Sequence, residues 1–141
     1  MIYLACDHRG FYRKEEIKRF LVENQLEFVD VGAREFDPND DEVDFVNEAC
    51  SKLRTGDKLI AICGSGVMVD IAANKNKGVR ACLAFGEDQV RMARNDDDVN
   101  ALCLAADFFN FEETVNFVKI FLNTNFSNEE RFVRRIKKLW I

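Results

Sequence analysis

The chain has 141 residues, of which 48% are hydrophobic, and its 25 acidic residues outnumber its 20 basic residues to give a formal net charge of -5. This length and apolar content predict one domain, spanning residues 1–141, around a single core. The acidic balance excludes a protein with a dominant basic face for nucleic acid, so we expect no nucleic-acid partner. No apolar run approaches the roughly 20 residues that cross a bilayer, so we expect no membrane span.

The cysteines indicate the redox compartment. They are odd in number and show no C-x-x-C spacing, which predicts neither a disulfide framework nor a zinc site. The chain begins with a short strand-like run rather than a basic region followed by a long apolar one, so we expect no signal peptide. These features favour a cytoplasmic protein. The cysteines are Cys6, Cys50, Cys63, Cys82 and Cys103.

The first apolar run, residues 2–6, has the length of a buried strand and leads directly into Asp7 and His8. An amphipathic segment with helical spacing follows, and residues 26–32 are predicted to form a second strand. His8 is the only histidine in the chain. Its position at a strand end beside an aspartate leaves a structural and a functional role equally open. A single histidine without neighbouring ligands predicts no metal site.

A long acidic connection, residues 33–44, comes after the second strand and contains the only proline, Pro38. The stretch from residue 35 to residue 48 carries seven acidic side chains and no basic one. This composition favours a solvated surface loop.

The third apolar run, residues 58–64, includes Cys63 and leads into Gly64, Ser65 and Gly66, with a helix-like segment behind them. The backbone N–H groups of such a turn, at a helix N-terminus, favour an anion. The dinucleotide-binding and P-loop patterns are both incomplete, which argues against nicotinamide and ATP binding. A thiolate at this position could act as a base beside an oxyanion hole, and a core cysteine is the equally open alternative. We expect the other four cysteines to have packing roles.

Two more strands are predicted, at residues 79–85 and 101–106, and the segment 93–100 precedes the last of them. We expect this segment and the ends of the first three strands to converge at the edge where open parallel sheets bind ligands. A helix is predicted over residues 111–123. The alternation of strands and helices predicts an α/β fold with three layers and a doubly wound, five-stranded parallel sheet.

A basic segment closes the chain. Arg131, Arg134 and Arg135 occupy positions i, i+3 and i+4, so they share one face of a helix and could bind a phosphate together. A solvated basic helix is the alternative interpretation.

Four segments, "CDHRG", "ICGSGVMVDIAANKNKGVRA", "DVNAL" and "RFVRRI", resemble in order and spacing the signatures of type B ribose-5-phosphate isomerases and galactose-6-phosphate isomerase subunits. The similarity runs over essentially the whole chain. It implies a flavodoxin-like or Rossmann-like fold in a homodimer or tetramer, with the C-terminal helix used in dimerisation. It also implies active sites built from two subunits, with no metal and no organic cofactor.

The resemblance assigns a role to each candidate residue. It implies that Cys63 moves a proton between C1 and C2 of an aldose phosphate through a cis-enediolate, and that Ser65 assists near the substrate oxygens. Asp96 stands where the ribose enzymes have a ring-opening histidine. The implied substrate-binding residues, which include the loop that holds the enediolate, are Asp7, His8, Gly64, Gly66, Val67, Asn100, Arg131, Arg134 and Arg135.

Several positions depart from the ribose-enzyme pattern: Asp96, Phe45 in place of a tyrosine, Met68 in place of the second loop glycine, and Asp70 in place of a small neutral residue. The leading prediction is an aldose–ketose isomerase for a sugar phosphate, with ribose 5-phosphate as the first substrate. A galactose-6-phosphate isomerase type subunit, or a sugar-phosphate-binding subunit that no longer catalyses alone, is the alternative. A flavin or signalling domain follows from the fold alone.

Overall fold

The computed structural model describes residues 1–140, so Ile141, the last residue of the predicted domain, lies outside the described part. Its centre is a five-stranded parallel sheet with the strand order β2-β1-β3-β5-β4. The predicted α/β class with a parallel sheet is confirmed. The strands are β1 (Ile2–Cys6), β2 (Phe28–Asp30), β3 (Lys58–Cys63), β4 (Ala81–Leu83) and β5 (Ala101–Ala105).

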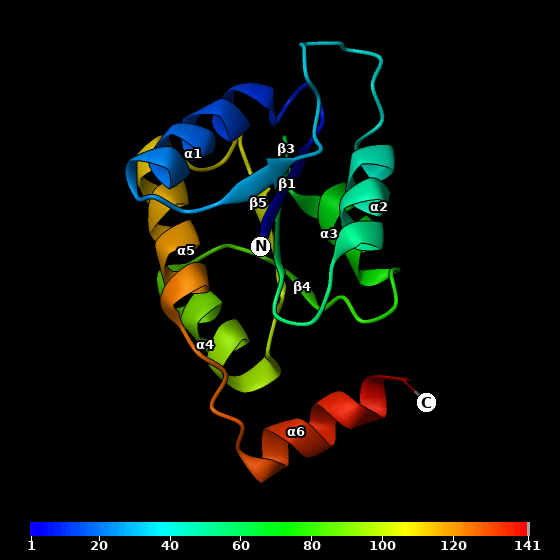
Figure 1. Cartoon of the computed structure of the whole chain (residues 1–141), viewed down its shortest axis with the longest axis vertical. Coiled ribbons are helices and arrows are strands. Elements are labelled where there is room, and N and C mark those ends of the chain that lie inside the picture. The colour runs from blue at the N-terminus through cyan, green and yellow to red at the C-terminus, as the bar shows by residue number, and fades with distance from the viewer. Residues whose placement is uncertain (141) are drawn as a thin grey trace.

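Helices cover both faces of the sheet. One face packs against α1, α4 and α5, and the other packs against α2 and α3 (Figure 1). The sixth helix, α6, lies beyond one end of the sheet. None of the helices within residues 1–140 is both long and apolar enough to cross a membrane. The helices are α1 (Phe11–Glu23), α2 (Glu42–Lys52), α3 (Val67–Asn74), α4 (Glu87–Asp97), α5 (Phe111–Asn123) and α6 (Glu130–Lys137), followed by a short 3₁₀ turn, Lys138–Trp140.

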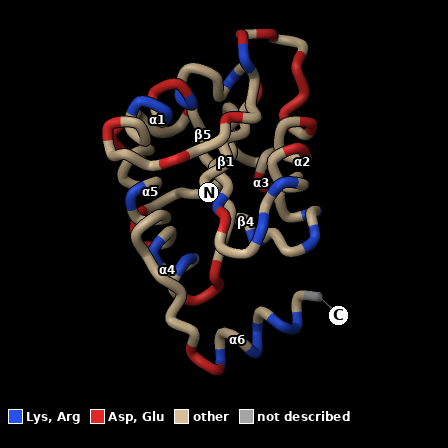
Figure 2. The backbone as a smooth tube through the Cα atoms, in the orientation of Figure 1, with Lys and Arg blue, Asp and Glu red and all other residues tan. Residues whose placement is uncertain are grey.

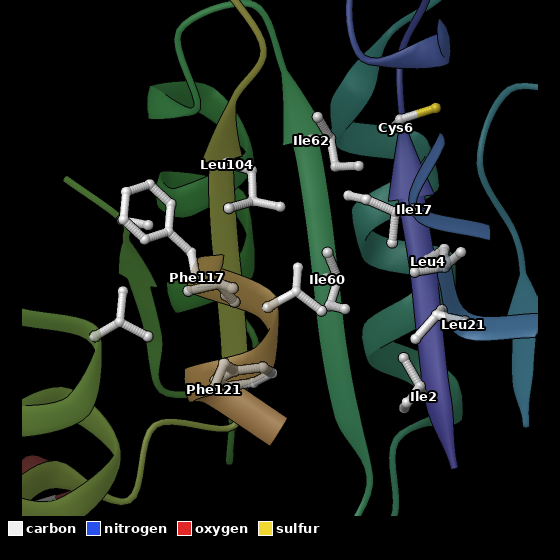
Figure 3. Close-up of a cluster of buried hydrophobic side chains, with 14 of the residues drawn as sticks. Ile2, Leu4, Cys6, Ile17, Leu21, Ile60, Ile62, Leu104, Phe117 and Phe121 are labelled. Carbon is white, nitrogen blue, oxygen red and sulfur yellow. The ribbon is translucent and has the colours of Figure 1, made fainter. Parts of the chain in front are cut away.

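Apart from Lys58, β3 is apolar throughout, because its side chains alternate between two buried faces. Ile60 and Ile62 face the α1 and α5 layer, where they share a cluster with Phe117 (Figure 3). Leu59 and Cys63 belong to the opposite cluster, under α2 and α3. Each fully buried side chain of this kind contributes about 1.5–3 kcal/mol. The register of β3 therefore directs the Cys63 side chain towards the α3 side of the sheet.

The order of the last two strands differs from the 2-1-3-4-5 order of a flavodoxin-like sheet. All five residues of β5 are buried, and this strand lies between β3 and β4. The three residues of β4 are only partly buried, and β4 forms the edge of the sheet. β5 has five apolar residues and β4 has three, so the interior position buries more apolar surface when β5 occupies it.

The side of the sheet on which successive strands are added changes between β2 and β3. The chain runs from β1 outward to β2, and then returns to place β3 on the other side of β1. In open α/β sheets, ligands bind at the carboxyl ends of the strands beside such a switch point. The loops after β1 and β3 are therefore the expected location of a functional site.

Candidate active site

The carboxyl ends of β1, β3 and β5 bring three short loops together. Cys6 of β1 pairs with Ile62, and Cys63 pairs with Ala105 of β5. The backbone N–H of Asp107, just beyond β5, donates a hydrogen bond to the carbonyl of Gly64 at 3.0 Å. This bond ties the loop after β5 to the glycine loop after β3.

Cys63 lies at the base of the glycine loop. Its Sγ accepts a hydrogen bond from the backbone N–H of Gly66 at 3.1 Å. Gly66 has a φ of +73°, and a Cβ there would collide with Leu83 and approach the Ala105 nitrogen to 3.2 Å, so only glycine fits. The cysteine is 4% exposed.

Two backbone amides of the loop donate to partners in this chain. Gly66 donates to the Cys63 sulfur, and Val67 donates to the Ser65 hydroxyl at 3.3 Å. Because α3 begins at Val67, the amides of Met68 and Val69 have no acceptor within the helix, and the helix dipole favours negative charge at the loop. Met68 is 44% exposed, so much of its side chain faces solvent.

The surroundings of the other four cysteines favour the neutral thiol. Burial raises the pKa of Cys6 and of Cys82 to about 12, and that of Cys50 to about 11. Burial also raises the pKa of Cys103 well above its usual value. These groups stay protonated at neutral pH, as suits the packing roles expected for them.

The loop after β1 holds Asp7 and His8. Asp7 is buried, and its Oδ1 accepts a hydrogen bond from the backbone N–H of Gly10 at 2.9 Å. Burial raises the pKa of Asp7. The His8 and Phe36 rings lie nearly perpendicular to each other, with 5.7 Å between the centroids.

The acidic connection is not solvated along its whole length. Asp40, near its end, has a side chain that is only 10% exposed and binds His8. Its Oδ1 accepts the His8 backbone N–H at 3.0 Å and lies 2.6 Å from the ring Nδ1. The composition of the segment predicted a surface loop, which holds for residues 34–39 but is wrong for Asp40. Composition carries no information on which one of many acidic residues turns inward.

Asp7, His8 and Asp40 have ligand atoms within 4.8 Å of one another, close enough to share one metal ion. The 2.6 Å separation of His8 Nδ1 and Asp40 Oδ1 is, however, that of a hydrogen bond. A carboxylate oxygen can only accept, so Nδ1–H donates. We therefore assign the cluster to hydrogen bonding.

Sequence reasoning missed an ion pair at this edge. The Arg9 guanidinium pairs with the Asp107 carboxylate and lies against Gly64, where a Cβ would collide with it. Two signals were available: Arg9 directly follows His8, and Asp107 follows the carboxyl end of the last strand. Before that strand, residues 96–98 form an acidic run. This run is more conspicuous in the sequence than the single Asp107, so the Arg9–Asp107 pair was not predicted.

The expectation that segment 93–100 joins this edge is wrong within one chain. Ala101, which follows the segment, pairs with Leu59 at the start of β3, whereas Cys63 pairs with Ala105. A segment that precedes a parallel strand reaches the amino edge of the sheet, about 13 Å from the carboxyl edge at 3.3 Å per residue. Asp96 and Asn100 are therefore on the far edge from Cys63.

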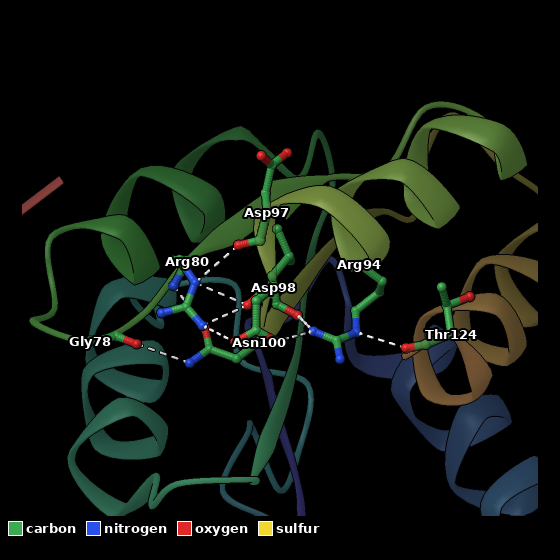
Figure 4. Close-up of polar contacts among 8 residues, drawn as sticks. Gly78, Arg80, Arg94, Asp97, Asp98, Asn100 and Thr124 are labelled. Atoms are coloured by element: carbon green, nitrogen blue, oxygen red, sulfur yellow. Dashed lines mark hydrogen bonds and ion pairs between the residues drawn. The ribbon is translucent and has the colours of Figure 1, made fainter. Parts of the chain in front are cut away.

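Asn100 is held by backbone groups at the amino edge (Figure 4). Its Oδ1 accepts the Arg80 N–H at 2.7 Å, and its Nδ2 donates to the Gly78 carbonyl at 2.9 Å. Asp98 accepts from Arg80 at 2.7 Å and from Arg94 at 3.0 Å. This network orders the turn that carries Asp96 and Asn100.

The three predicted arginines also lie away from the glycine loop. Figure 2 shows the basic residues of α6 at the opposite end of the molecule from the acidic loop. The Arg131 guanidinium lies 4.4 Å from the centre of the Phe132 ring and pairs with Glu129 at 2.9 Å. Arg135 lines a cavity of about 780 Å³ between α6, α4 and β4. The candidate residues thus fall into two groups at opposite edges of the sheet.

A thiol, a glycine loop and a partly buried Asp–His pair at the switch point of a doubly wound sheet define a small-molecule-binding α/β protein. Residues 2–139 match the family model described as Ribose/Galactose Isomerase. The chain therefore belongs to the ribose/galactose isomerase family, which confirms the resemblance seen in its motifs.

Individual relatives agree with this assignment. The probable ribose-5-phosphate isomerase B of Mycoplasma genitalium is 40% identical over 141 residues, which cover 98% of this chain and 92% of that protein. The crystal structure of the M. genitalium ribose-5-phosphate isomerase B with bound ribulose-5-phosphate has a TM-score of 0.93, with 40% identity and coverage of 98% and 92%. The enzyme from Thermotoga maritima has a TM-score of 0.93 at 32% identity, with coverage of 98% and 95%.

Proposed function

We propose that this protein is a sugar-phosphate isomerase that interconverts ribose 5-phosphate and ribulose 5-phosphate, with Cys63 as the base. The observation that carries the proposal is the Cys63 sulfur at the end of β3, 3.1 Å from the Gly66 amide and in front of α3. The relative with bound ribulose-5-phosphate supports the choice of substrate.

The chemistry is a proton transfer between neighbouring carbons. The Cys63 thiolate removes the proton from C2 of the open-chain aldose, and the electron pair forms the C1–C2 double bond with negative charge on O1. The glycine loop and the α3 dipole stabilise this cis-enediolate. A proton moves from O2 to O1 beside Ser65, and Cys63 returns its proton to C1 to give the ketose. The thiolate and the amides supply base and oxyanion hole, so the scheme needs neither metal nor organic cofactor.

The rest of the site requires a second copy of the chain. Asp7 and His8 lie at the carboxyl edge with Cys63, whereas Asp96, Asn100 and the α6 arginines lie at the amino end. We assign ring opening to Asp96 and phosphate binding to the arginines of a partner subunit in a homodimer or tetramer. The cavity beneath α6, with exposed Phe85 and Met92 beside it, supports α6 as the element that docks. The five free thiols support a reducing compartment such as the cytoplasm.

The test compares Cys63→Ala with Cys50→Ala in a turnover assay with ribose 5-phosphate. A general base contributes about 10²–10⁴-fold, so we expect kcat to fall about a thousandfold in Cys63→Ala. Cys50→Ala, which removes a thiol from the far end of α2, should retain wild-type kcat. Full activity in Cys63→Ala, with circular dichroism showing an intact fold, would exclude the thiol as base.

The same assay with allose 6-phosphate and galactose 6-phosphate separates the substrate alternatives. Turnover of galactose 6-phosphate alone would place the chain with the galactose-6-phosphate isomerase subunits. Calorimetric binding of a sugar phosphate without any turnover would favour a subunit that no longer catalyses alone.

A further inference from the structure

His8 and Asp40 form a close pair although 32 positions separate them in the chain. One carboxylate oxygen, Asp40 Oδ1, accepts two hydrogen bonds from His8, one from the backbone N–H at 3.0 Å and one from Nδ1 at 2.6 Å. The two bonds determine both the position of the His8 backbone and the rotation of its ring. Because Nδ1–H is used by Asp40, Nε2 is the ring nitrogen left for a ligand.

The second oxygen of Asp40 makes the pair unusual. Within residues 1–140, Asp40 Oδ2 is buried and has no hydrogen-bond partner. Buried carboxylate oxygens are normally satisfied, because an unpaired buried charge is costly. A positive charge on His8, which is in direct contact with this carboxylate, would compensate it.

The other charged groups around His8 act in both directions. Asp7 adds a second negative charge next to the ring, and Arg9 adds a positive one. Glu42, at the start of α2, acts on Asp7. The hydrogen bond to Asp40 is the largest influence and raises the pKa of His8, against partial desolvation and the Arg9 charge.

We propose that Asp40 is a positioning residue that keeps His8 as an oriented imidazolium, so that its Nε2–H binds the phosphoryl group of the substrate. A charge-assisted hydrogen bond to a phosphate is roughly twice as strong as a neutral one. This places a cation for the anionic end of the substrate at the carboxyl edge of the same chain that carries Cys63. The inference rests on the proposed function for the identity of the anion.

The first experiment measures the charge of His8 directly. His8 is the only histidine in the chain, so its imidazole C–H signals can be followed by nuclear magnetic resonance without ambiguity. We expect the wild-type pKa to lie above the ordinary value of about 6.5, and to fall in Asp40→Asn, which keeps an acceptor for the backbone N–H but removes the charge. Asp37→Asn removes the same charge from an exposed position of the same loop and should leave the titration unchanged.

The second experiment measures binding of inorganic phosphate by calorimetry across the same pH range. Each unit by which the His8 pKa falls lowers the imidazolium fraction about tenfold at a pH above both pKa values. We therefore expect Asp40→Asn to weaken phosphate binding roughly three- to tenfold near pH 8, and to match wild type near pH 5, where both proteins carry a charged ring. Phosphate itself titrates identically in all samples, so the ratio of wild type to variant is the quantity compared.

Three results would overturn the proposal. One is a wild-type His8 that titrates at or below the ordinary value, which needs no variant at all and is unaffected if Asp40→Asn fails to fold. Another is an unchanged pKa in a folded Asp40→Asn. The third is a lowered pKa with unchanged phosphate binding, which would remove the link to the substrate. If Asp40-dependent phosphate binding appears while wild-type protein shows no turnover, the isomerase assignment fails and this inference stands.

Discussion

The Asp70 carboxyl group lies in the first turn of α3, close to the glycine loop in sequence. A carboxylate there would oppose an anion held by the loop unless it points away. Its neighbours are the Cys103 thiol in the middle of β5 and the Asn74 amide, whose Nδ2 lies 3.4 Å from Oδ1. The group therefore faces the sheet and the next turn of its own helix rather than the anion site.

Burial raises the pKa of Asp70 above its unfolded value of 3.8. The folded state thus disfavours the charged form, and stability falls as the pH rises from about the unfolded value through the folded one. We expect Asp70→Asn to stabilise the protein at pH 7 by about 0.5 kcal/mol, because the group is only half-buried and solvent screens it. Thermal unfolding should show a Tm higher by about 1–2 °C.

Repeating the Asp70→Asn measurement near pH 3 provides the control. Asp70 is largely protonated there in both states, so the advantage of the variant should disappear. An equal difference in Tm at both pH values would show that packing, rather than charge, is responsible.

Among the structural elements, α1 is joined to β2 by a buried lysine. The Lys14 side chain is 1% exposed, and its Nζ lies 3.0 Å and 2.9 Å from the two carboxylate oxygens of Asp30. Nζ also donates to the carbonyl of Ala33 at 2.5 Å. Because Ala33 begins the acidic loop, this lysine anchors the segment that later delivers Asp40 to His8.

We expect Lys14→Met to lower the free energy of unfolding by about 3 kcal/mol, since removing one partner of a buried pair typically costs 3–5 kcal/mol. We expect the lower end of this energy range because the Lys18 ammonium, 3.0 Å from Asp30, still pairs with the carboxylate in the variant. Urea unfolding followed by circular dichroism measures the change.

Lys18→Met is the matched control, because it removes a more exposed partner of the same carboxylate. Its cost should stay below about 1 kcal/mol. Similar decreases in the free energy of unfolding of the two variants would show that the burial of Lys14 does not increase its contribution to stability.

In the molecule taken as a whole, the two groups of candidate residues at opposite edges predict complementation between chains. A Cys63→Ala chain keeps its arginines, and a chain with Arg131, Arg134 and Arg135 all changed to alanine keeps its thiol. If each site combines the two edges from different subunits, a mixed dimer contains one complete site.

We expect each variant alone to show less than about 1% of wild-type turnover, and an equal mixture, denatured and refolded together, to recover about a quarter. Each variant refolded with itself is the control. Failure of the mixture to recover activity, with mixed dimers confirmed by mass spectrometry, would show that a single chain holds the whole site.

The predictable part of the fold rested on local patterns. The runs around β1, β3 and β5 are buried on both faces, so their sequences are apolar at every position except Lys58 and are easy to recognise. The run at residues 79–85 is less informative, because only Ala81–Leu83 pairs in the sheet. Its place at the edge, outside β5, depends on which strand gains most from burial, and no single segment encodes that comparison.

The predictable part of the candidate site was the part carried by neighbouring residues. Cys63 and the glycine loop are contiguous, and Asp7 adjoins His8, so sequence motifs reveal both. The partners across the edge are different. Arg9 meets Asp107 across 98 positions, and no local pattern links such distant residues.

The sequence by itself determined the parallel α/β class, the thiol at the end of a strand, the glycine turn and the family, because each depends on residues that are close together in the chain. Only the tertiary structure decided that Asp40 turns inward to His8, that Asp107 meets Arg9, and that segment 93–100 belongs to the opposite edge. The physical reason is that these arrangements depend on strand order and direction. The full length of a parallel strand separates the loop at its amino end from the loop at its carboxyl end, although the two loops are near neighbours in the sequence.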